Sequence, residues 1–451
     1  MPNCLVIGAR GYIGTRLVDA LVEAGHEVRV LVRAADGVRP GVDIVEADAG
    51  DPTALATAMS EVDTAYHLVH SMSGPDFVST DDRIAHAVAT AAADAHIRQL
   101  VYLGGPRPHD DDVSDHLASR ASVGDIFLNA PTPALVLQAS MVIGAGSASF
   151  ELLNRAARSA PFVLRPAYLD NRSRPIAVRD VLHYLVDAAK GAPVNAVADI
   201  AGPDTMTYLQ LIQRCARLSG LPWRLPIPVA VLPAGPAALA ASALSPLSAP
   251  LVRALLDSLR HDLVPDAVLP PPPGGATSVD RALREALGIP DPQGPPTTGL
   301  LRDHKATTVR ATTDALWREI TNIGGPHGWH TIPGVWTLRG ALDHALGGVG
   351  LHKGRPDHLN AGDVVDTWSV VKRDDTDHVL LLRADMRLPG TAWLELRAVP
   401  GDRPEECRYE QTVLFEPSGL AGKLYWYAQK PAHDIVFALM LQGTARAAEN
   451  L

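Results

Sequence analysis

Residues 4–21 have the sequence CLVIGARGYIGTRLVDAL. An apolar run leads into a turn that contains Gly8, Gly11 and Gly14, and an amphipathic helical pattern follows. Gly8 permits a tight turn, Gly11 lets the backbone approach a pyrophosphate, and Gly14 allows a helix to pack closely on a strand. The N-terminus of such a helix offers free N–H groups and a positive dipole end. These residues therefore predict a strand–turn–helix unit that binds a dinucleotide.

Apolar, β-rich runs alternate with helical stretches from residue 3 to about residue 145. This alternation predicts βαβ units, and therefore an α/β fold of Rossmann type with a doubly wound parallel sheet between two layers of helices. Residues 264–298 are rich in proline and glycine, which indicates a domain boundary. We expect a first domain over residues 1–295 and a second over residues 300–451.

The composition of the 451-residue chain restricts the class of protein. It is 47% hydrophobic and 20% charged, as in globular proteins, and its net charge of −10 argues against nucleic acid as a partner. The three cysteines are far apart in the sequence, so neither a disulfide framework nor a structural metal site is expected. The sequence starts without the pattern of a secretory signal, and we expect a cytoplasmic protein.

The segment between Arg224 and Arg253 carries no charge and is long enough to span a bilayer. It contains six prolines, each of which would disrupt a spanning helix. We therefore expect residues 225–263 to form short buried helices and loops that cover a pocket. The alternative is peripheral contact with a membrane.

The choice of nucleotide depends on the end of the second strand. An NAD site normally places an acidic residue there, but this strand ends in Arg33, and the glycine turn adds Arg10. Two guanidinium groups suit a 2′-phosphate, so NADP(H) is predicted, with Asp48 near the adenine. The full set of expected cofactor-binding residues is Gly8, Arg10, Gly11, Tyr12, Ile13, Gly14, Arg33, Asp48, Ala49, Leu68, Val69, His70 and Gly104.

Residues 1–295 resemble the atypical extended short-chain dehydrogenase/reductases of the NmrA-like branch. The resemblance rests on the glycine turn and on the segments RPIAVRDV (174–181) and IAGPDTMTYLQLI (200–212). Residues 300–451 resemble a C-terminal family of unknown function that is fused to such domains. The segment FEPSGLAGKLYWY (415–427) is one of the stretches on which this resemblance rests. That family is similar to the START/helix-grip superfamily, which implies an α+β fold that encloses an apolar ligand.

The C-terminal domain also shows strand patterns followed by a long helix over residues 433–449. An antiparallel sheet wrapped on a terminal helix leaves a cavity between them, and tryptophans could line it. They could equally form an ordinary core, since aromatic residues often pack together. The tryptophans concerned are Trp329, Trp336, Trp368, Trp393 and Trp426.

The segment HLASRASVG, residues 116–124, lies where short-chain reductases carry a tyrosine and a lysine four residues apart, and it has neither. Lys190 is the single lysine of the first 300 residues. Arg120 could bind ribose or phosphate, but an arginine does not act as a base. His70 and His116 could titrate near neutrality, and Tyr168 lies in a loop on the expected substrate side. Each of these four candidate catalytic residues could instead be structural.

Two classes of function follow. The first is an NADP(H)-dependent oxidoreductase that acts on an apolar small molecule of isoprenoid, quinone, polyketide or acyl type without the usual tyrosine and lysine. The second is a non-catalytic NADP(H)-binding sensor or a carrier of apolar ligands. A lyase or isomerase that keeps the nucleotide is a weaker third option, and the oligomeric state stays open.

Overall fold

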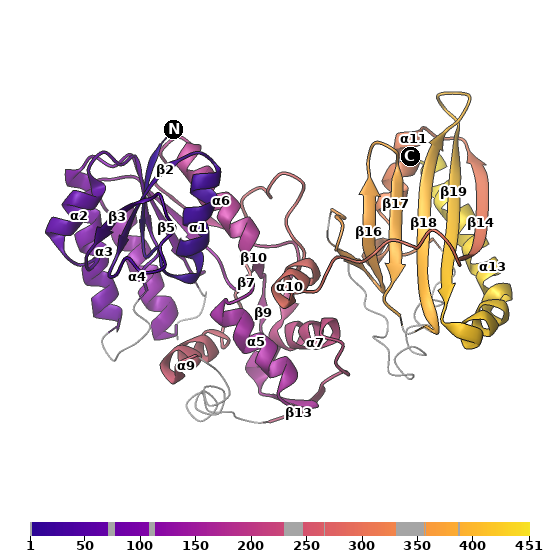
Figure 1. Cartoon of the computed structure of the whole chain (residues 1–451), viewed down its shortest axis with the longest axis horizontal. Coiled ribbons are helices and arrows are strands. Elements are labelled where there is room, and N and C mark those ends of the chain that lie inside the picture. Colours follow the sequence, from indigo (N-terminus) through magenta and orange to yellow (C-terminus); the bar gives the residue numbers. More distant parts are fainter. Residues whose placement is uncertain are drawn as a thin grey trace. The chain divides into compact units, whose positions relative to one another are not determined.

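The computed structural model divides the chain into two compact units, Met1–Leu287 and Gly288–Leu451, and each is described by itself (Figure 1). This division lies a few residues before the boundary expected from the sequence. The structure describes residues 2–70, 77–107, 113–229, 247–265, 267–330, 356, 358–386 and 388–451.

The first unit is built on a seven-stranded sheet in which every neighbouring pair of strands is parallel. The order of its first six strands, 3-2-1-4-5-6, is that of a doubly wound Rossmann sheet, which confirms the predicted α/β fold. The strands in spatial order are β3 (Asp43–Glu46), β2 (Glu27–Val32), β1 (Asn3–Ile7), β4 (Thr64–His67), β5 (Gln99–Gly104), β6 (Ala134–Gln138) and β11 (Ala196–Asp199).

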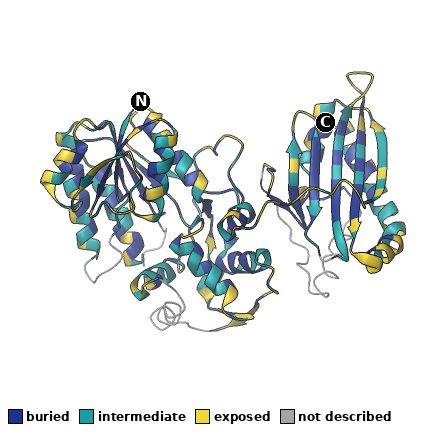
Figure 2. Ribbon diagram, in the orientation of Figure 1, coloured by how far each residue is buried: buried dark blue, intermediate teal, exposed yellow. Residues whose placement is uncertain are grey.

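Helices cover both faces of this sheet. Strand β1 shows why, because its side chains alternate between two apolar cores. Leu5 and Ile7 join one core, and Cys4 and Val6 join the other. The helices on the first side are α2 (Pro52–Met59), α3 (Phe77–Asp94) and α4 (Asp115–Leu128), and those on the second are α1 (Tyr12–Glu23) and α6 (Val178–Lys190). Figure 2 shows the strands as the most buried layer.

A smaller lobe of the same unit follows the sheet and has its own apolar core. Its short strands pair two by two: β7 (Val142–Ile143) with β10 (Ile176–Ala177), β9 (Arg172–Ser173) with β12 (Met206–Thr207), and β8 (Phe162–Arg165) with β13 (Leu225–Pro228). Asp180 of α6 accepts hydrogen bonds from Thr277 N at 2.7 Å and Thr277 Oγ1 at 2.8 Å, which ties the last part of the unit to the sheet. The elements of the lobe are β7 (Val142–Ile143), α5 (Ala148–Arg158), β8 (Phe162–Arg165), η1 (Ala167–Asp170), β9 (Arg172–Ser173), β10 (Ile176–Ala177), β12 (Met206–Thr207), α7 (Tyr208–Leu218), β13 (Leu225–Pro228), α9 (Ala249–Ser258) and α10 (Val279–Leu287).

The second unit is an antiparallel six-stranded sheet with helices packed on one face. Helices α11 (Thr313–Thr321) and α13 (Gly419–Glu449) supply Leu316, Phe437 and Met440 to the apolar core on that face. A short helix, η2 (Gly325–His327), follows α11. The main elements are β14 (Leu301–Val309), α11 (Thr313–Thr321), β15 (Val364–Val365), β16 (Trp368–Asp374), β17 (Val379–Ala384), β18 (Gly390–Pro400), β19 (Cys407–Pro417) and α13 (Gly419–Glu449).

Helix α13 is longer than the sequence suggests. We expected a helix over residues 433–449, but it begins at Gly419 and continues through Pro431. A proline inside a helix removes one N–H and frees a carbonyl one turn earlier. That carbonyl belongs to Tyr427, which is exposed, so water can form a hydrogen bond with it.

Among the described residues, none of the helices combines the length and the apolarity that crossing a membrane requires.

Candidate functional site

The glycine turn lies between β1 and α1, at the point where the strand order reverses. Gly8 has φ +91°, and a Cβ on it would lie 2.9 Å from the carbonyl carbon of Leu68, just after β4. A Cβ on Gly14 would overlap the Gly8 carbonyl oxygen and lie 2.8 Å from Ala9 Cα. Two of the three glycines are therefore required by close backbone approach, as their spacing predicts.

The first turn of α1 is open to an anion. Its N-cap is Gly11, which offers no side-chain cap, and no acidic residue lies in the first turn. The N–H groups of Tyr12, Ile13 and Gly14 occupy helix positions that have no acceptor within the helix. The glycine turn, which has few side chains, and the free N–H groups beside it therefore fit the pyrophosphate of a dinucleotide.

Arg10 and Arg33 lie at the same end of β2. Arg10 Nη1 donates to the carbonyl oxygen of Ala34 at 3.4 Å, so its guanidinium lies beside the residue that follows Arg33. Both side chains are exposed. Asp48 follows β3, where its Oδ1 accepts from Gly50 N at 2.8 Å and shapes the turn that contains Ala49. Arg10 and Arg33 therefore lie at the same edge of the sheet, although they are far apart in the sequence.

Five side chains gather near the carboxyl ends of β4 and β5: His67, His70, Tyr102, His116 and Arg120. The ring of Tyr102 lies 5.9 Å from that of His67 and 5.8 Å from that of His70. Tyr102 Oη donates to the Arg120 carbonyl oxygen at 3.3 Å. Helix α4 begins at Asp115, so it carries His116 and Arg120 to this edge. The structure therefore brings together three of the four candidate catalytic residues, and it adds His67.

The histidines of this edge do not titrate near neutrality, which corrects our expectation. Burial, followed by the charge of Arg120, lowers the pKa of His116 to about 3. Burial, followed by the charge of Arg120, holds the pKa of His70 well below its usual range. Burial alone lowers the pKa of His67 to about 4. All three imidazoles are therefore neutral at pH 7, because removing them from water penalises the charged form.

Arg120 is held at the end of β5. Its Nη2 donates to the carbonyl oxygen of Leu103 at 2.9 Å, and a Cβ on Gly105 would lie 3.3 Å from its Cδ. Its Nε is buried, and nothing in the described part of the chain accepts from it. A fixed cation with an unused donor therefore lies beside Gly104, the last residue of β5.

The remaining expected residues of this edge follow β4. Leu68 N donates to the Ile7 carbonyl oxygen at 2.9 Å and so continues the sheet past the strand. Val69 packs against the core under α3 and α4. Residues 71–76 and 108–112, which continue from this edge, lie outside the described residues.

Tyr168 lies apart from the other three candidate catalytic residues. It is in η1 of the smaller lobe, where burial and then the charge of Asp257 raise its pKa. Asp257 belongs to α9, and α9 packs against α4. No described contact joins Tyr168 to His70, His116 or Arg120. Helix α9 is thus the element that lies between the two groups.

The expected cover, residues 225–263, is not a buried layer in its described parts. In α9 the buried residues are Val252 and Ser258, and Leu225 and Ile227 of β13 are exposed. The physical reason is that β13 is an edge strand that pairs with β8 alone. Residues 230–246 of this segment lie outside the described residues.

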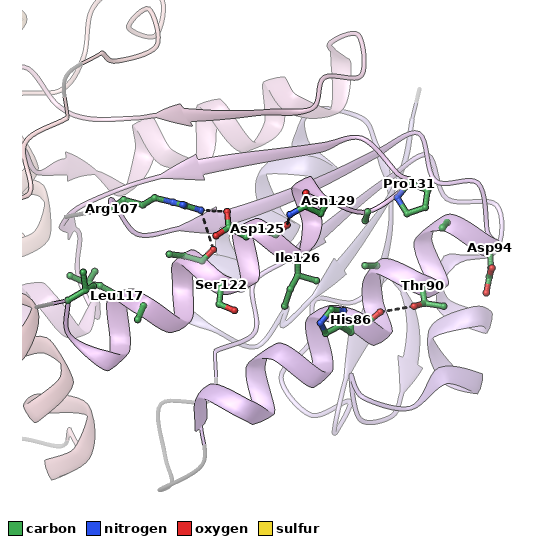
Figure 3. A pocket seen from close by; sticks show the side chains of 16 residues that line it. His86, Thr90, Asp94, Arg107, Leu117, Ser122, Asp125, Ile126, Asn129 and Pro131 are labelled. Atoms are coloured by element: carbon green, nitrogen blue, oxygen red, sulfur yellow. Dashed lines mark hydrogen bonds and ion pairs between the residues drawn. The ribbon is translucent and has the colours of Figure 1, made fainter. Parts of the chain in front are cut away.

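A groove of about 880 Å³ lies between α3 and α4. His86 and Thr90 lie on one side and Ser122 and Ile126 on the other, and Arg107 pairs with Asp125 at its edge (Figure 3). None of the expected site residues lines this groove. The groove is therefore separate from the glycine turn and from the polar edge, by which we mean the cluster of His67, His70, Tyr102, His116 and Arg120 at the carboxyl ends of β4 and β5.

The described tryptophans of the second unit do not line one cavity. Trp329, Trp368 and Trp426 are buried in the core between the sheet and its helices. Trp393 is on the opposite face of the sheet, because it alternates with Leu394 along β18, and its Nε1 donates to the Gln293 carbonyl oxygen at 2.9 Å. Trp336 lies outside the described residues.

The strand order, the glycine turn and the uncapped helix define the first unit as an NAD(P)-binding Rossmann domain like those of short-chain dehydrogenases/reductases. Comparison with known protein families also indicates a domain that binds NAD(P). Residues 8–130 match a family described as NAD(P)H-binding, and residues 297–440 match one described as a protein of unknown function (DUF2867).

The chain is similar to several named reductases. It is 29% identical over 233 residues to the ceramide reductase of Caulobacter vibrioides, a match that covers 49% of this chain and 71% of that protein. It is 27% identical over 224 residues to the (4-alkanoyl-5-oxo-2,5-dihydrofuran-3-yl)methyl phosphate reductase of Streptomyces griseus, covering 49% and 75%. Pinoresinol reductase 1 of Arabidopsis thaliana is 38% identical over 87 residues, covering 17% and 26%.

Solved structures of similar fold include gox2253, with a TM-score of 0.48 and 16% identity over 64% of this chain and 98% of that chain. Another is the UDP-N-acetylglucosamine 4-epimerase of Bacillus cereus, with a TM-score of 0.43 and 16% identity over 51% of this chain and 86% of that chain.

Proposed function

We propose that this protein is an NADP(H)-dependent oxidoreductase that acts on an apolar small molecule. The observation that carries the proposal is the position of the polar edge. His70, His116 and Arg120 gather at the carboxyl ends of β4 and β5, beside the glycine turn, where open α/β sheets bind their ligands. Three named reductases among the relatives support the reaction class.

The preference for NADP(H) rests on Arg10 and Arg33. Both guanidinium groups are exposed at the end of β2, and Arg33 stands where an NAD site would have an acid. Charge-assisted hydrogen bonds from two arginines favour a 2′-phosphate over a hydroxyl.

The side chains of the polar edge would bind and orient the reacting groups but would not supply the proton. A bound nicotinamide supplies or accepts the hydride. Arg120 stabilises negative charge on a carbonyl oxygen by its own positive charge, or holds the nicotinamide ribose. His70 and His116 stay neutral and orient groups by hydrogen bonding, since their lowered pKa values leave no imidazolium to give a proton. We propose that the proton comes from water, which suits a conjugated carbonyl substrate.

The apolar character of the substrate is supported by two observations. The segment between Arg224 and Arg253 is uncharged, and it leads into α9, a helix that packs against the helix that carries Arg120. The named substrate of one relative is a ceramide. We also propose that the second unit is START-like in architecture, since its long helix packs across an antiparallel sheet.

Deuterium transfer tests the proposed reaction. The full chain is incubated with NADPH deuterated at C4 and a set of long-chain ketones and enones, and the products are analysed by mass spectrometry. The proposal expects deuterium in at least one reduced product. It also expects Arg120→Met to lower kcat/KM by about 10²-fold or more, on the scale of a lost transition-state donor. Reduction at an unchanged rate in that variant would remove Arg120 from the mechanism.

One observation favours a second candidate, a non-catalytic NADP(H)-binding sensor. The chain has no Tyr-x-x-x-Lys, and the imidazoles of His70 and His116 are neutral. A sensor needs the nucleotide site and no proton donor. NADPH binding without deuterium transfer to any compound of the set favours this candidate.

A further inference from the structure

Strands β8 and β13 form a two-stranded ribbon, residues 162–165 and 225–228, on the smaller lobe of the first unit. The pairing is parallel and aligns Leu225 with Phe162 and Ile227 with Leu164. Paired residues of neighbouring strands point to the same side, so these four side chains share one face. Val163, which points the other way, is buried in the core of the lobe. The ribbon therefore has an inner face on the core and an entirely apolar outer face.

The outer face of the ribbon is exposed. Trp223, just before β13, extends the same surface, and Pro226 and Pro228 lie within the strand at its edge. Soluble proteins usually break up such surfaces with charges, but no charged residue lies on this face. The exposed fractions are 41% for Phe162, 39% for Leu164, 53% for Trp223, 57% for Leu225 and 38% for Ile227.

The charges next to the ribbon are mainly positive. The last turn of α5, which leads into β8, carries Arg155 and Arg158, and β8 ends in Arg165. Arg165 pairs with Asp170 at 2.9 Å. Residues 148–170 and 223–228 together carry four arginines, the fourth being the buried Arg224, and two acids, Glu151 and Asp170. They leave a local excess of two positive charges on a chain whose net charge is −10. Such a local excess is complementary to an anionic surface.

We propose that the outer face of the β8–β13 ribbon docks on an anionic lipid surface. Tryptophan, leucine and phenylalanine beside arginine are the side chains that favour the boundary between lipid headgroups and acyl chains. The sequence that follows β13 is also uncharged as far as Arg253. Two residues separate β8 from Tyr168, so a docked ribbon would hold the expected substrate side at the membrane. This last point rests on the proposed reduction of an apolar substrate, whereas the docking itself does not.

Vesicle flotation of the full chain tests the proposal. The vesicles contain phosphatidylcholine alone or phosphatidylcholine with phosphatidylglycerol, and no nucleotide is added. We expect binding to the anionic vesicles and weaker binding to the neutral ones. The double variant Leu225→Asp/Ile227→Asp should lose at least about tenfold in affinity, because two apolar side chains no longer enter the lipid.

The matched control is Leu420→Asp/Leu424→Asp on α13, where the two side chains are 74% and 64% exposed. It should keep the binding of the unchanged protein. An equal loss in the control would assign the lipid surface to α13 and overturn the proposal. Absence of binding to anionic vesicles would also overturn it. So would a dimer in sedimentation that the ribbon variant converts to a monomer, since the ribbon would then be covered by a second copy.

Fluorescence provides a second measurement if the double variant does not fold. Brominated lipid quenches a tryptophan that enters the acyl region, and Trp223 is the single tryptophan of the first 300 residues. We expect quenching that Trp223→Phe largely removes, and unchanged quenching in that variant would contradict the proposal. Loss of deuterium transfer with intact vesicle binding would refute the proposed reaction and leave the docking standing.

Discussion

At the level of single residues, Gly14 illustrates how a missing side chain shapes the site. Its spacing from Gly8 and Gly11 was enough to predict close packing, because only backbone geometry is involved. The environment of the histidines could not be predicted in this way. His70 and His116 are polar and near a predicted ligand edge, but their neutral state results from burial and from the charge of Arg120, which the sequence does not locate in space.

Gly14→Ala should destabilise the first unit. The new Cβ would overlap backbone atoms of Gly8 and Ala9, which cannot move without shifting the turn. Overpacking of this kind costs about 1–3 kcal/mol. Chemical denaturation with and without NADPH measures the loss. The control is Gly191→Ala, where the nearest atom would be 4.0 Å away. Equal stability of the two variants would contradict the close packing.

His67 should make the first unit sensitive to acid. In the unfolded chain a histidine has a pKa near 6.5, whereas burial lowers that of His67 to about 4 in the folded protein. Between these values the unfolded state binds more protons, so stability falls as the pH falls. The loss at pH 5 relative to pH 7.5 is about 2 kcal/mol.

The test is His67→Phe, which replaces the imidazole with a ring that can pack near Phe127, 5.1 Å away in the structure. Thermal unfolding at pH 5 and at pH 7.5 should show a smaller difference between the two conditions in this variant. His86→Phe, at an exposed position of α3, should leave the difference as it is. An unchanged difference in His67→Phe would show that His67 is protonated in the folded protein.

Arg33→Asp should change the choice of nucleotide. It removes a charged hydrogen-bond donor and adds a repulsive charge, which should weaken NADPH binding by about 1.5–3 kcal/mol. NADH binding should stay the same or improve, because an acid at this position suits a ribose hydroxyl. Calorimetric titration of both nucleotides measures this, with Arg302→Asp in the second unit as the control. Equal losses for NADPH and NADH would refute the assignment.

Among the elements, the strands of the first sheet were the most predictable. The start of the proline-containing helix α13 and the short strands β8 and β13 were the least predictable. The strands of the first sheet follow from continuous apolar runs, which fully buried parallel strands require. The start of α13 was missed because Pro431 indicates a break, whereas an exposed helix surface tolerates it. The ribbon of β8 and β13 was missed because strands of four residues with two prolines carry no clear pattern.

Asp180 ties α6 to the end of the first unit, and its loss should be costly. Burial raises the pKa of this carboxyl, and its two oxygens accept from Thr277 N and Oγ1. Asp180→Asn places an amide donor against one of these donors, which should cost about 1–3 kcal/mol. Asp187→Asn, at an exposed position of the same helix, is the control in denaturant unfolding. If both variants keep full stability, the contact does not hold the unit together.

For the whole molecule, the division at residue 287 predicts two separately folding parts. A chain that ends at Gly288 retains the glycine turn, the seven-stranded sheet and the anchor at Thr277. It should unfold cooperatively and bind NADPH with an affinity within about threefold of the full chain, since the binding residues all lie in one domain. Loss of binding in a folded fragment would show that the second unit contributes to the nucleotide site.

The most direct measurement is a crystal structure of the full chain with NADP+. The proposed function predicts the pyrophosphate at the N-terminus of α1 and the 2′-phosphate between Arg10 and Arg33. It also predicts that one face of the nicotinamide C4 is open toward the space between Arg120 and α9, where a substrate can approach. A C4 atom covered by protein side chains on both faces would contradict the proposed reductase and leave a nucleotide-binding sensor.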